Sequence, residues 1–152
     1  MKLRTEINKS AEEEIIIRCQ KRTEQIDLLE RVIENMILEN AELALQLNEV
    51  DYFVPKKDIL FFETAGGKVS AHTANGMYYT DYRLFELEQI MGASFQRISK
   101  SCVVNCRAIS AIRKNLTGAS EVMFRDCNKK VYLSRSYYHI LRDKLMEVRG
   151  IK

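Results

Sequence analysis

The chain has few of the residues from which catalytic and metal sites are usually built. Its only histidines are His72 and His139, and its four cysteines include no pair spaced as CxxC. Cytosolic thiols are usually reduced, so we interpret the cysteines as small apolar or surface residues. A zinc site would need further ligands, and neither histidine has suitable partners nearby in the sequence. We therefore expect no metal, no cofactor and no disulfide.

Sequence motifs of the common enzyme classes are missing as well. The stretch Gly66-Gly67-Lys68 lacks the spacing of a phosphate-binding P-loop, and there is no GxGxxG, GxSxG or HExxH. Two isolated histidines leave little scope for a catalytic triad. We predict that the protein is not an enzyme.

Long hydrophobic runs are also absent. No apolar stretch approaches the roughly 18 residues that a membrane span requires. The first residues, Met1 to Glu6, lack the apolar core of a secretory signal. We expect a cytoplasmic protein.

Charge is distributed unevenly along the chain. Residues 96–152 carry thirteen lysines and arginines against four acids, a net charge of +9, whereas residues 1–95 carry a net charge of −6. The overall +3 therefore hides an acidic half and a basic half. Such asymmetry is expected of a protein that binds a polyanion.

The first 42 residues are predicted to form a small ββα segment. Residues 3–7 alternate weakly between polar and apolar, and residues 14–19 contain a short β-branched run, so both suit strands. Thr23 is placed to cap a helix that continues to about residue 39.

An apolar stripe runs through and beyond this helix. Its members follow heptad spacing, with an asparagine at one position of the kind that fixes register in dimers: Ile26, Leu29, Ile33, Met36, Asn40, Leu43 and Leu47. This pattern allows a dimer of helices, although a single helix packing on its own domain would show it too. Its last part also alternates as a strand does, and we favour a helix followed by a strand.

Residues 43–152 are predicted to be mostly strands. Gly66-Gly67 is a hairpin signal, and Asn75-Gly76 is typical of a type I′ turn. A short helix over residues 82–91 should stop at Gly92, and Ser134 or Ser136 could cap a last helix. The predicted strands cover residues 52–54, 59–63, 68–73, 77–80, 95–98, 102–105, 109–113, 121–125 and 130–133. The fold class is α+β and rich in β-structure.

Cations and hydroxyls gather at three connections of this region. In an extended segment Arg97, Ser99 and Ser101 would share one face, with Lys100 near the turn. Such side chains suit phosphate oxygens, and arginine or lysine can also reach guanine edges. Residues 134–138 form a second group at a strand-to-helix junction, and the hairpin ending in Lys68 forms a third. Together they favour nucleic-acid binding.

Several segments resemble the LytTR family of bacterial DNA-binding domains. The matching stretches are residues 58–63, 66–69, 82–88, 95–105 and 131–137, and the likeness extends from about residue 43 to 148. The resemblance implies an elongated domain of about ten mostly antiparallel strands that inserts loops into the grooves of promoter repeats in double-stranded DNA. It thus implies a sequence-specific transcriptional regulator.

The resemblance also assigns roles to individual positions. It makes Arg97 a clamp on the DNA backbone and Asn105 a structural residue. The side chains expected to bind DNA are Lys68, Arg97, Lys100, Ser101, Lys114, Arg135, Ser136 and Tyr137.

Many members of this family carry a receiver domain in front of the DNA-binding domain. About 40 N-terminal residues cannot hold one, so the chain resembles the stand-alone members. The resemblance then implies a membrane-bound partner that restrains the protein, and the N-terminal segment suggests a homodimer. A protein of another class fits the charge pattern too, namely an interaction module whose basic face binds an acidic partner.

Overall fold

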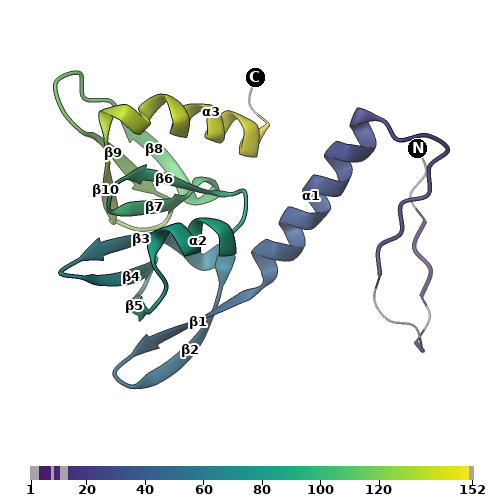
Figure 1. Ribbon diagram of the computed structural model, residues 1–152, viewed down its shortest axis with the longest axis horizontal. Helices are drawn as coiled ribbons and strands as arrows, with labels where there is room; N and C mark the ends of the chain where they lie inside the picture. The colour runs from purple at the N-terminus through teal and green to yellow at the C-terminus, as the bar shows by residue number, and fades with distance from the viewer. Residues whose placement is uncertain (1–3, 8, 11–13, 151–152) are drawn as a thin grey trace.

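The computed structural model describes residues 4–7, 9–10 and 14–150. A β-rich body carries one helix that extends away from it (Figure 1). The helices are α1 (Glu24–Asn40), α2 (Leu84–Ile90) and α3 (Tyr138–Arg149). The strands are β1 (Glu42–Leu47), β2 (Val50–Pro55), β3 (Ile59–Ala65), β4 (Lys68–Thr73), β5 (Met77–Thr80), β6 (Phe95–Ser99), β7 (Cys102–Asn105), β8 (Ile109–Arg113), β9 (Ser120–Phe124) and β10 (Lys130–Leu133).

The strands form two antiparallel sheets. Seven strands pair in the order β2-β1-β5-β4-β3-β7-β6, and three in the order β10-β9-β8. The prediction of a β-rich α+β fold with about ten antiparallel strands is confirmed. Short 3-10 turns lie between elements: η1 (Lys56–Asp58), η2 (Cys106–Ala108) and η3 (Arg135–Tyr137).

Helix α1 begins and ends as its sequence predicts. Thr23 caps it, because its Oγ1 accepts a hydrogen bond from the amide of Ile26 at 3.4 Å, and its carbonyl oxygen accepts the first bonds of the helix, from the amides of Ile26 and Asp27. The helix stops at Asn40, and β1 follows with Leu43 and Leu45 buried. The strand interpretation of this stretch is therefore confirmed, and the continuation of the heptad stripe beyond Asn40 is wrong.

The two strands predicted ahead of α1 do not form. Residues 4–7 and 14–19 lie outside any sheet, and residue 3 lies outside the described part of the chain. The side chains of Ile7, Ile15 and Ile16 are 88%, 65% and 57% exposed. A strand gains its stability from a partner and a covered face, and these segments have neither in the described structure.

Two hairpins close through two-residue turns with left-handed backbone. Gly66 and Gly67 have φ of +58° and +78°, between the paired residues Ala65 and Lys68. Asn48 and Glu49 have φ of +52° and +63° and join β1 to β2 in the same way. Positive φ at both central positions defines a type I′ turn, whose twist matches that of the strands.

The type I′ turn predicted at Asn75-Gly76 is wrong, since neither residue has a positive φ. The chain there closes instead through a hydrogen bond from the amide of Thr73 to the carbonyl of Gly76 at 3.0 Å.

The seven-stranded sheet has a hydrophobic core on each face. Phe62 and Val103 point toward α2 and share a core with Leu87 of that helix. Phe61 and Val104 point the other way, into a core shared with the three-stranded sheet and α3. This follows from the period of two along a strand, and it fixes which face every neighbouring polar side chain occupies.

Buried polar groups tie the chain together around β7. The Nδ2 of Asn105 donates to the carbonyl of Ile59 at 3.0 Å, and its Oδ1 accepts from the amide of Arg107 at 3.0 Å. Cys102 and Cys106 are buried in the core, and burial raises the pKa of the Cys106 thiol to about 12. Asn105 therefore has the structural role expected of it, and these two cysteines behave as small apolar residues.

The last helix starts later than predicted. A 3-10 turn over Arg135–Tyr137 precedes α3, and the amide of Tyr137 donates to the carbonyl of Ser134 at 3.0 Å. No serine side chain caps the helix, so that prediction is wrong. The helix ends at Arg149, and Gly150, with a φ of +62°, forms a left-handed cap after it.

Candidate nucleic-acid interface

Three connections of the β-rich body meet at one edge. The amide of Thr64 donates to the carbonyl of Ser101 at 2.8 Å, which joins the β3–β4 hairpin to the β6–β7 turn. The amide of Ser134 donates to the carbonyl of Ile98 at 2.9 Å, which joins the end of β10 to the end of β6. We call the surface formed by residues 65–68, 99–102 and 133–136 the tip edge. It lies on the side of the molecule away from α1 (Figure 1).

Lys68 stands at the tip of the β3–β4 hairpin. It is exposed, and its Nζ lies 5.7 Å from the centre of the Tyr79 ring. Such a cation–ring contact orients the side chain while leaving the ammonium accessible to an anion. The hairpin thus presents one exposed cation at the start of β4.

The β6–β7 turn presents Lys100 and Ser101, which are both exposed. The amide of Ser101 donates to the Oγ of Ser99 at 3.2 Å, and the two hydroxyls lie 3.4 Å apart. The Nη2 of Arg97 donates to the carbonyl of Lys100 at 3.4 Å. These bonds fix the turn in advance, so little conformational freedom is lost when it binds a ligand.

Arg97 does not lie beside the two serines. The pairing of β6 with β7 shifts between Arg97 and Ser99, so that Arg97 pairs with Val103 while Ser99 pairs with Cys102. Val103 and Cys102 face opposite cores, and paired residues share a face. The prediction of one common face is wrong, because a bulge breaks the alternation.

On its own face, Arg97 lies near helix α2. Its side chain is 26% exposed, and its Nη1 lies 3.8 Å from the Glu88 carboxylate. Its guanidinium is therefore less accessible than the ammonium of Lys68 or Lys100.

The third connection contains Arg135, Ser136 and Tyr137. Arg135 and Ser136 are exposed, and the Oγ of Ser136 lies 3.3 Å from that of Ser134. Tyr137 is half-buried and packs against the core between the two sheets. Of these three side chains, Tyr137 has the least surface to offer a ligand.

Lys114 lies on the connection from β8 to β9. Its Nζ lies 4.9 Å from the centre of the Tyr138 ring, at the start of α3. The pocket lined by Lys114 shares Tyr132 and Ala119 with a pocket at the tip edge. Lys114 therefore borders the tip edge but does not belong to it.

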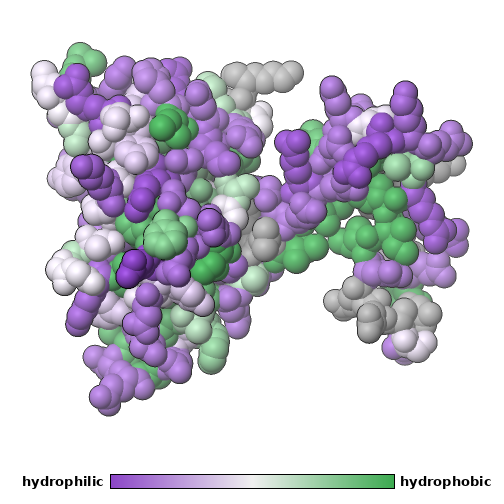
Figure 2. All heavy atoms as spheres, in the orientation of Figure 1, coloured by the Kyte–Doolittle hydropathy of each residue, from purple (hydrophilic) through white to green (hydrophobic). Residues whose placement is uncertain are grey.

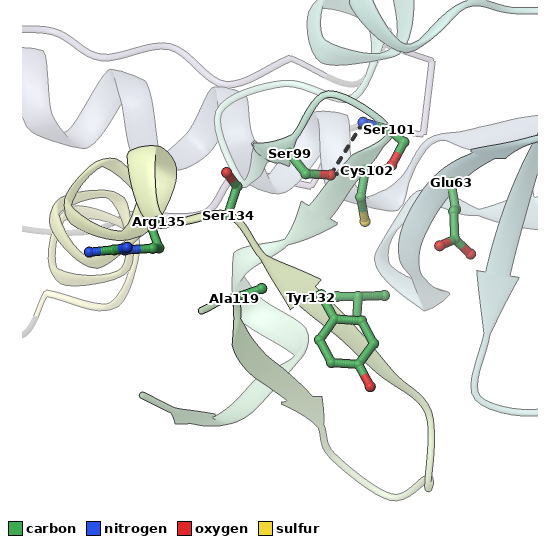
Figure 3. A pocket seen from close by; sticks show the side chains of 9 residues that line it. Glu63, Ser99, Ser101, Cys102, Ala119, Tyr132, Ser134 and Arg135 are labelled. Carbon is green, nitrogen blue, oxygen red and sulfur yellow. Dashed lines mark hydrogen bonds between the residues drawn. The ribbon is translucent and has the colours of Figure 1, made fainter. Parts of the chain in front are cut away.

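A pocket of about 480 Å³ opens at the tip edge, between the β6–β7 turn and the end of β10. Figure 3 shows Glu63 and Arg135 on opposite sides of this pocket, with three hydroxyls between them, those of Ser99, Ser101 and Ser134. Sequence reasoning singled out Arg135 and the serines but missed Glu63. The alternation of side chains along β3 could have revealed Glu63, because it places Glu63 on the same face as Phe61.

The part of the chain that the structure describes holds neither a candidate metal centre nor a candidate membrane span. No group of three or more histidine, cysteine, aspartate or glutamate side chains is arranged to hold a metal ion. No helix there has both the length and the hydrophobicity to cross a membrane.

The sequence and the fold together define the class of protein. The family described as the LytTr DNA-binding domain matches residues 49–146. The chain belongs to this family and carries a LytTr DNA-binding domain.

The chain is also similar to curated proteins along nearly its whole length. An uncharacterized HTH-type transcriptional regulator of Staphylococcus aureus strain MSSA476 is 27% identical over 146 residues, which cover 95% of this chain and 98% of the relative. A regulator of the same description from strain NCTC 8325 / PS 47 is 26% identical over the same length. A helix-turn-helix needs two consecutive α-helices. The described part of this chain has no such pair, because α1 is followed by β1 and α2 by β6.

The fold also matches a solved structure. The LytTr DNA-binding domain of a Bacillus cereus protein described as a methyl-accepting/DNA response regulator superposes with a TM-score of 0.64. The two chains are 23% identical, and the match covers 69% of this chain and 96% of the other. The body of this protein therefore has the LytTr fold.

Proposed function

We propose that the protein is a sequence-specific transcriptional regulator that inserts loops of its β-rich body into the grooves of promoter repeats. Its family and the names of its staphylococcal relatives support this proposal. So does the net charge of +9 in residues 96–152, because each phosphate neutralised by a cation releases counterions from the DNA. We assign no catalytic step and no cofactor to the protein.

The observation that carries the proposal is the meeting of cationic loops at the tip edge. Lys68, Lys100 and Arg135 come from three connections that backbone hydrogen bonds hold side by side. An edge of loops can follow a groove without a recognition helix, and long cations can reach base edges there. In this proposal the three cations read bases.

The remaining predicted residues have supporting roles in the same interface. Arg97 binds the DNA backbone, and the hydroxyls of Ser101 and Ser136 bind phosphate oxygens. Lys114 contacts the flanking backbone, and Tyr137 holds the third loop against the core. The cation–ring contact of Lys114 and the partial burial of Tyr137 support these roles.

We further propose that the protein works as a homodimer joined through α1. Leu28, Val32 and Met36 lie on one side of this helix at four-residue spacing and are 62%, 45% and 56% exposed. Figure 2 shows hydrophobic side chains gathered along the helix where it stands away from the body. A second copy of the helix would cover them. Of the predicted heptad stripe only Met36 belongs to this exposed face, since Ile26 is buried and Leu29 and Ile33 are partly buried. The membrane-bound partner implied by the resemblance stays a prediction.

Selection from a random pool of duplexes tests the proposed function. The full chain is incubated with the pool, the retained duplexes are sequenced, and the affinities of a selected and a random duplex are measured at several salt concentrations. We expect the selected duplex to bind at least about a thousandfold more tightly, and both affinities to fall steeply with salt. If the basic face instead binds an acidic protein, the retained duplexes should show no enriched sequence motif. That result would contradict the proposal of a sequence-specific regulator.

A further inference from the structure

Glu63 is the one acidic side chain that lines the pocket at the tip edge. It belongs to β3, where it pairs with Cys102 of β7 and follows Phe62, which points toward α2. The alternation along β3 therefore turns Glu63 toward Cys102 and the pocket. The position of this carboxylate is fixed by a central strand rather than by a mobile loop.

The carboxylate of Glu63 has no hydrogen bond or ion pair with any residue that the structure describes. Arg135 lines the same pocket, yet its guanidinium points away from Glu63, as Figure 3 shows. The two charges consequently remain available to a ligand. Glu63 is only partly exposed, so a group that reaches it must enter the pocket.

The chemistry of the pocket selects what can enter it. An ionised carboxylate only accepts hydrogen bonds, and it repels phosphate oxygens. In the major groove, cytosine offers the N4 amino group, a donor that glutamate accepts from, while guanine offers only acceptors. Adenine offers an amino group too, but its N7 acceptor lies beside it and suits an amide better than a carboxylate. The hydroxyls of Ser99 and Ser101 beside Glu63 can donate or accept and so fit the neighbouring base edges.

We propose that Glu63 is a specificity-determining residue that accepts a hydrogen bond from the amino group of a cytosine in the major groove. The inference rests on the proposed function and adds to it the identity of one base. In a surface that otherwise presents cations and hydroxyls, Glu63 weakens binding to every site that lacks a donor at this position. It acts through discrimination rather than through affinity.

The test repeats the selection from random duplexes with the full-length wild type and three variants. Glu63→Gln keeps the shape of the side chain but adds a donor, and Glu63→Ala removes the group. Glu42→Gln is the matched control, because it removes one negative charge from an exposed position at the start of β1, outside the tip edge. Thermal melting of each variant establishes that it is folded.

We expect the wild type and Glu42→Gln to favour cytosine at one position of the selected motif by about 5- to 150-fold. Glu63→Ala should reduce this preference to near equality, and Glu63→Gln should shift it toward adenine, which pairs with an amide group. An unchanged motif in both Glu63 variants would overturn the inference while leaving the proposed function intact. A uniform gain in the affinity of both Glu63 variants for all sequences would also overturn it, because Glu63 would then only repel phosphates and would not read a base. If the wild type enriches nothing, the proposed function fails, and the inference fails with it.

Discussion

The Nη2 of Arg97 donates a hydrogen bond to the carbonyl of Lys100 at 3.4 Å. The guanidinium thus supports the turn that presents Lys100, in addition to its contact with Glu88 of α2. Two roles follow for one side chain, as a cation for the DNA backbone and as a support for a reading loop. Loss of the first role would change the salt dependence of binding, and loss of the second would change the base preference.

Replacing Arg97 by Ala is expected to weaken binding to all duplexes alike and to reduce the dependence of log affinity on log salt by about one unit. The reason is the loss of one phosphate contact. Titrations of a selected and a random duplex at several salt concentrations measure both quantities. Glu88→Gln is the control, since it removes the acidic neighbour but keeps the cation. A changed base preference with an unchanged salt dependence would mean that Arg97 acts only by positioning Lys100.

Replacing Lys100 or Arg135 by Ala is expected to alter base preference by about 1–3 kcal/mol at one position each. Both side chains are exposed at the tip edge and can reach base edges. Lys57→Ala is the matched control, because Lys57 is an exposed cation of η1, outside the tip edge. Competition between duplexes that differ at single positions measures the effect. Equal losses for every duplex would show that these residues touch only the backbone.

Replacing Asn105 by Ala is expected to lower the free energy of unfolding by about 1–3 kcal/mol. The change removes the donor to the buried carbonyl of Ile59 and the acceptor of the Arg107 amide. Urea denaturation measures the loss, and Asn128→Ala, at an exposed position, is the control. Because Asn105 is buried, the selected DNA motif should stay the same. A new base preference in a stable Asn105→Ala protein would contradict the structural role.

Acid is expected to destabilise the protein through His72. Its ring stacks on Phe61 with centroids 4.3 Å apart, and burial, with a smaller effect of Lys129, lowers its pKa to about 4. The unfolded chain binds this proton near pH 6.5, so the stabilisation is complete above about pH 6.5 and lost as the pH falls toward 4. The loss should be on the order of 2 kcal/mol.

Urea denaturation between about pH 7 and about pH 4.5 checks this prediction. His72→Gln should be less stable than the wild type near neutral pH and should lose less stability on acidification. His139→Gln is the control, because His139 is exposed and should leave the pH dependence unchanged. If the free energy of unfolding of His72→Gln falls with pH as steeply as that of the wild type, groups other than His72 cause the acid sensitivity.

Charges placed on the exposed face of α1 are expected to halve the molecular mass in solution. Val32→Glu and Met36→Glu each put a carboxylate on the surface that a second copy would cover. Sedimentation equilibrium measures the mass, and Arg31→Gln is the control, because it changes the net charge by the same amount at an exposed position on another side of the same helix. A wild type that sediments as a monomer would remove the dimer, and the exposed side chains of α1 would then need another explanation.

Much of the fold was predictable because its signals are local. The strands from β3 to β10 are short runs that are either alternating or continuously apolar, as in β3 and β7, and glycines mark the hairpin at Gly66-Gly67 and the end of α2 at Gly92. The N-terminal strands were predicted wrongly, because their composition suits a strand but no partner covers them. The turn at Asn48-Glu49 carries no glycine, so its left-handed backbone could not be read from composition.

The candidate site was harder to predict than the fold. Sequence reasoning found the cations of the tip edge, because they stand at connections between strands. It could not place Arg97 and Ser99 on opposite faces, because the bulge between them depends on pairing with β7. It also missed Glu63, whose relation to Arg135 arises only when β3 and β10 come together.

The tight turn at Gly66-Gly67 has a mechanical consequence for groove binding. Only two residues separate Ala65 and Lys68, the last paired residues of β3 and β4. The distance by which Lys68 projects is therefore set by the length of the paired strands and not by a flexible loop. Each additional pair of residues would advance the ammonium by roughly 3.4 Å and reverse the side of the sheet from which it projects. The depth to which this hairpin can enter a groove therefore changes in discrete steps of one residue pair. Only an even number of added pairs would keep the Lys68 side chain on its present side of the sheet.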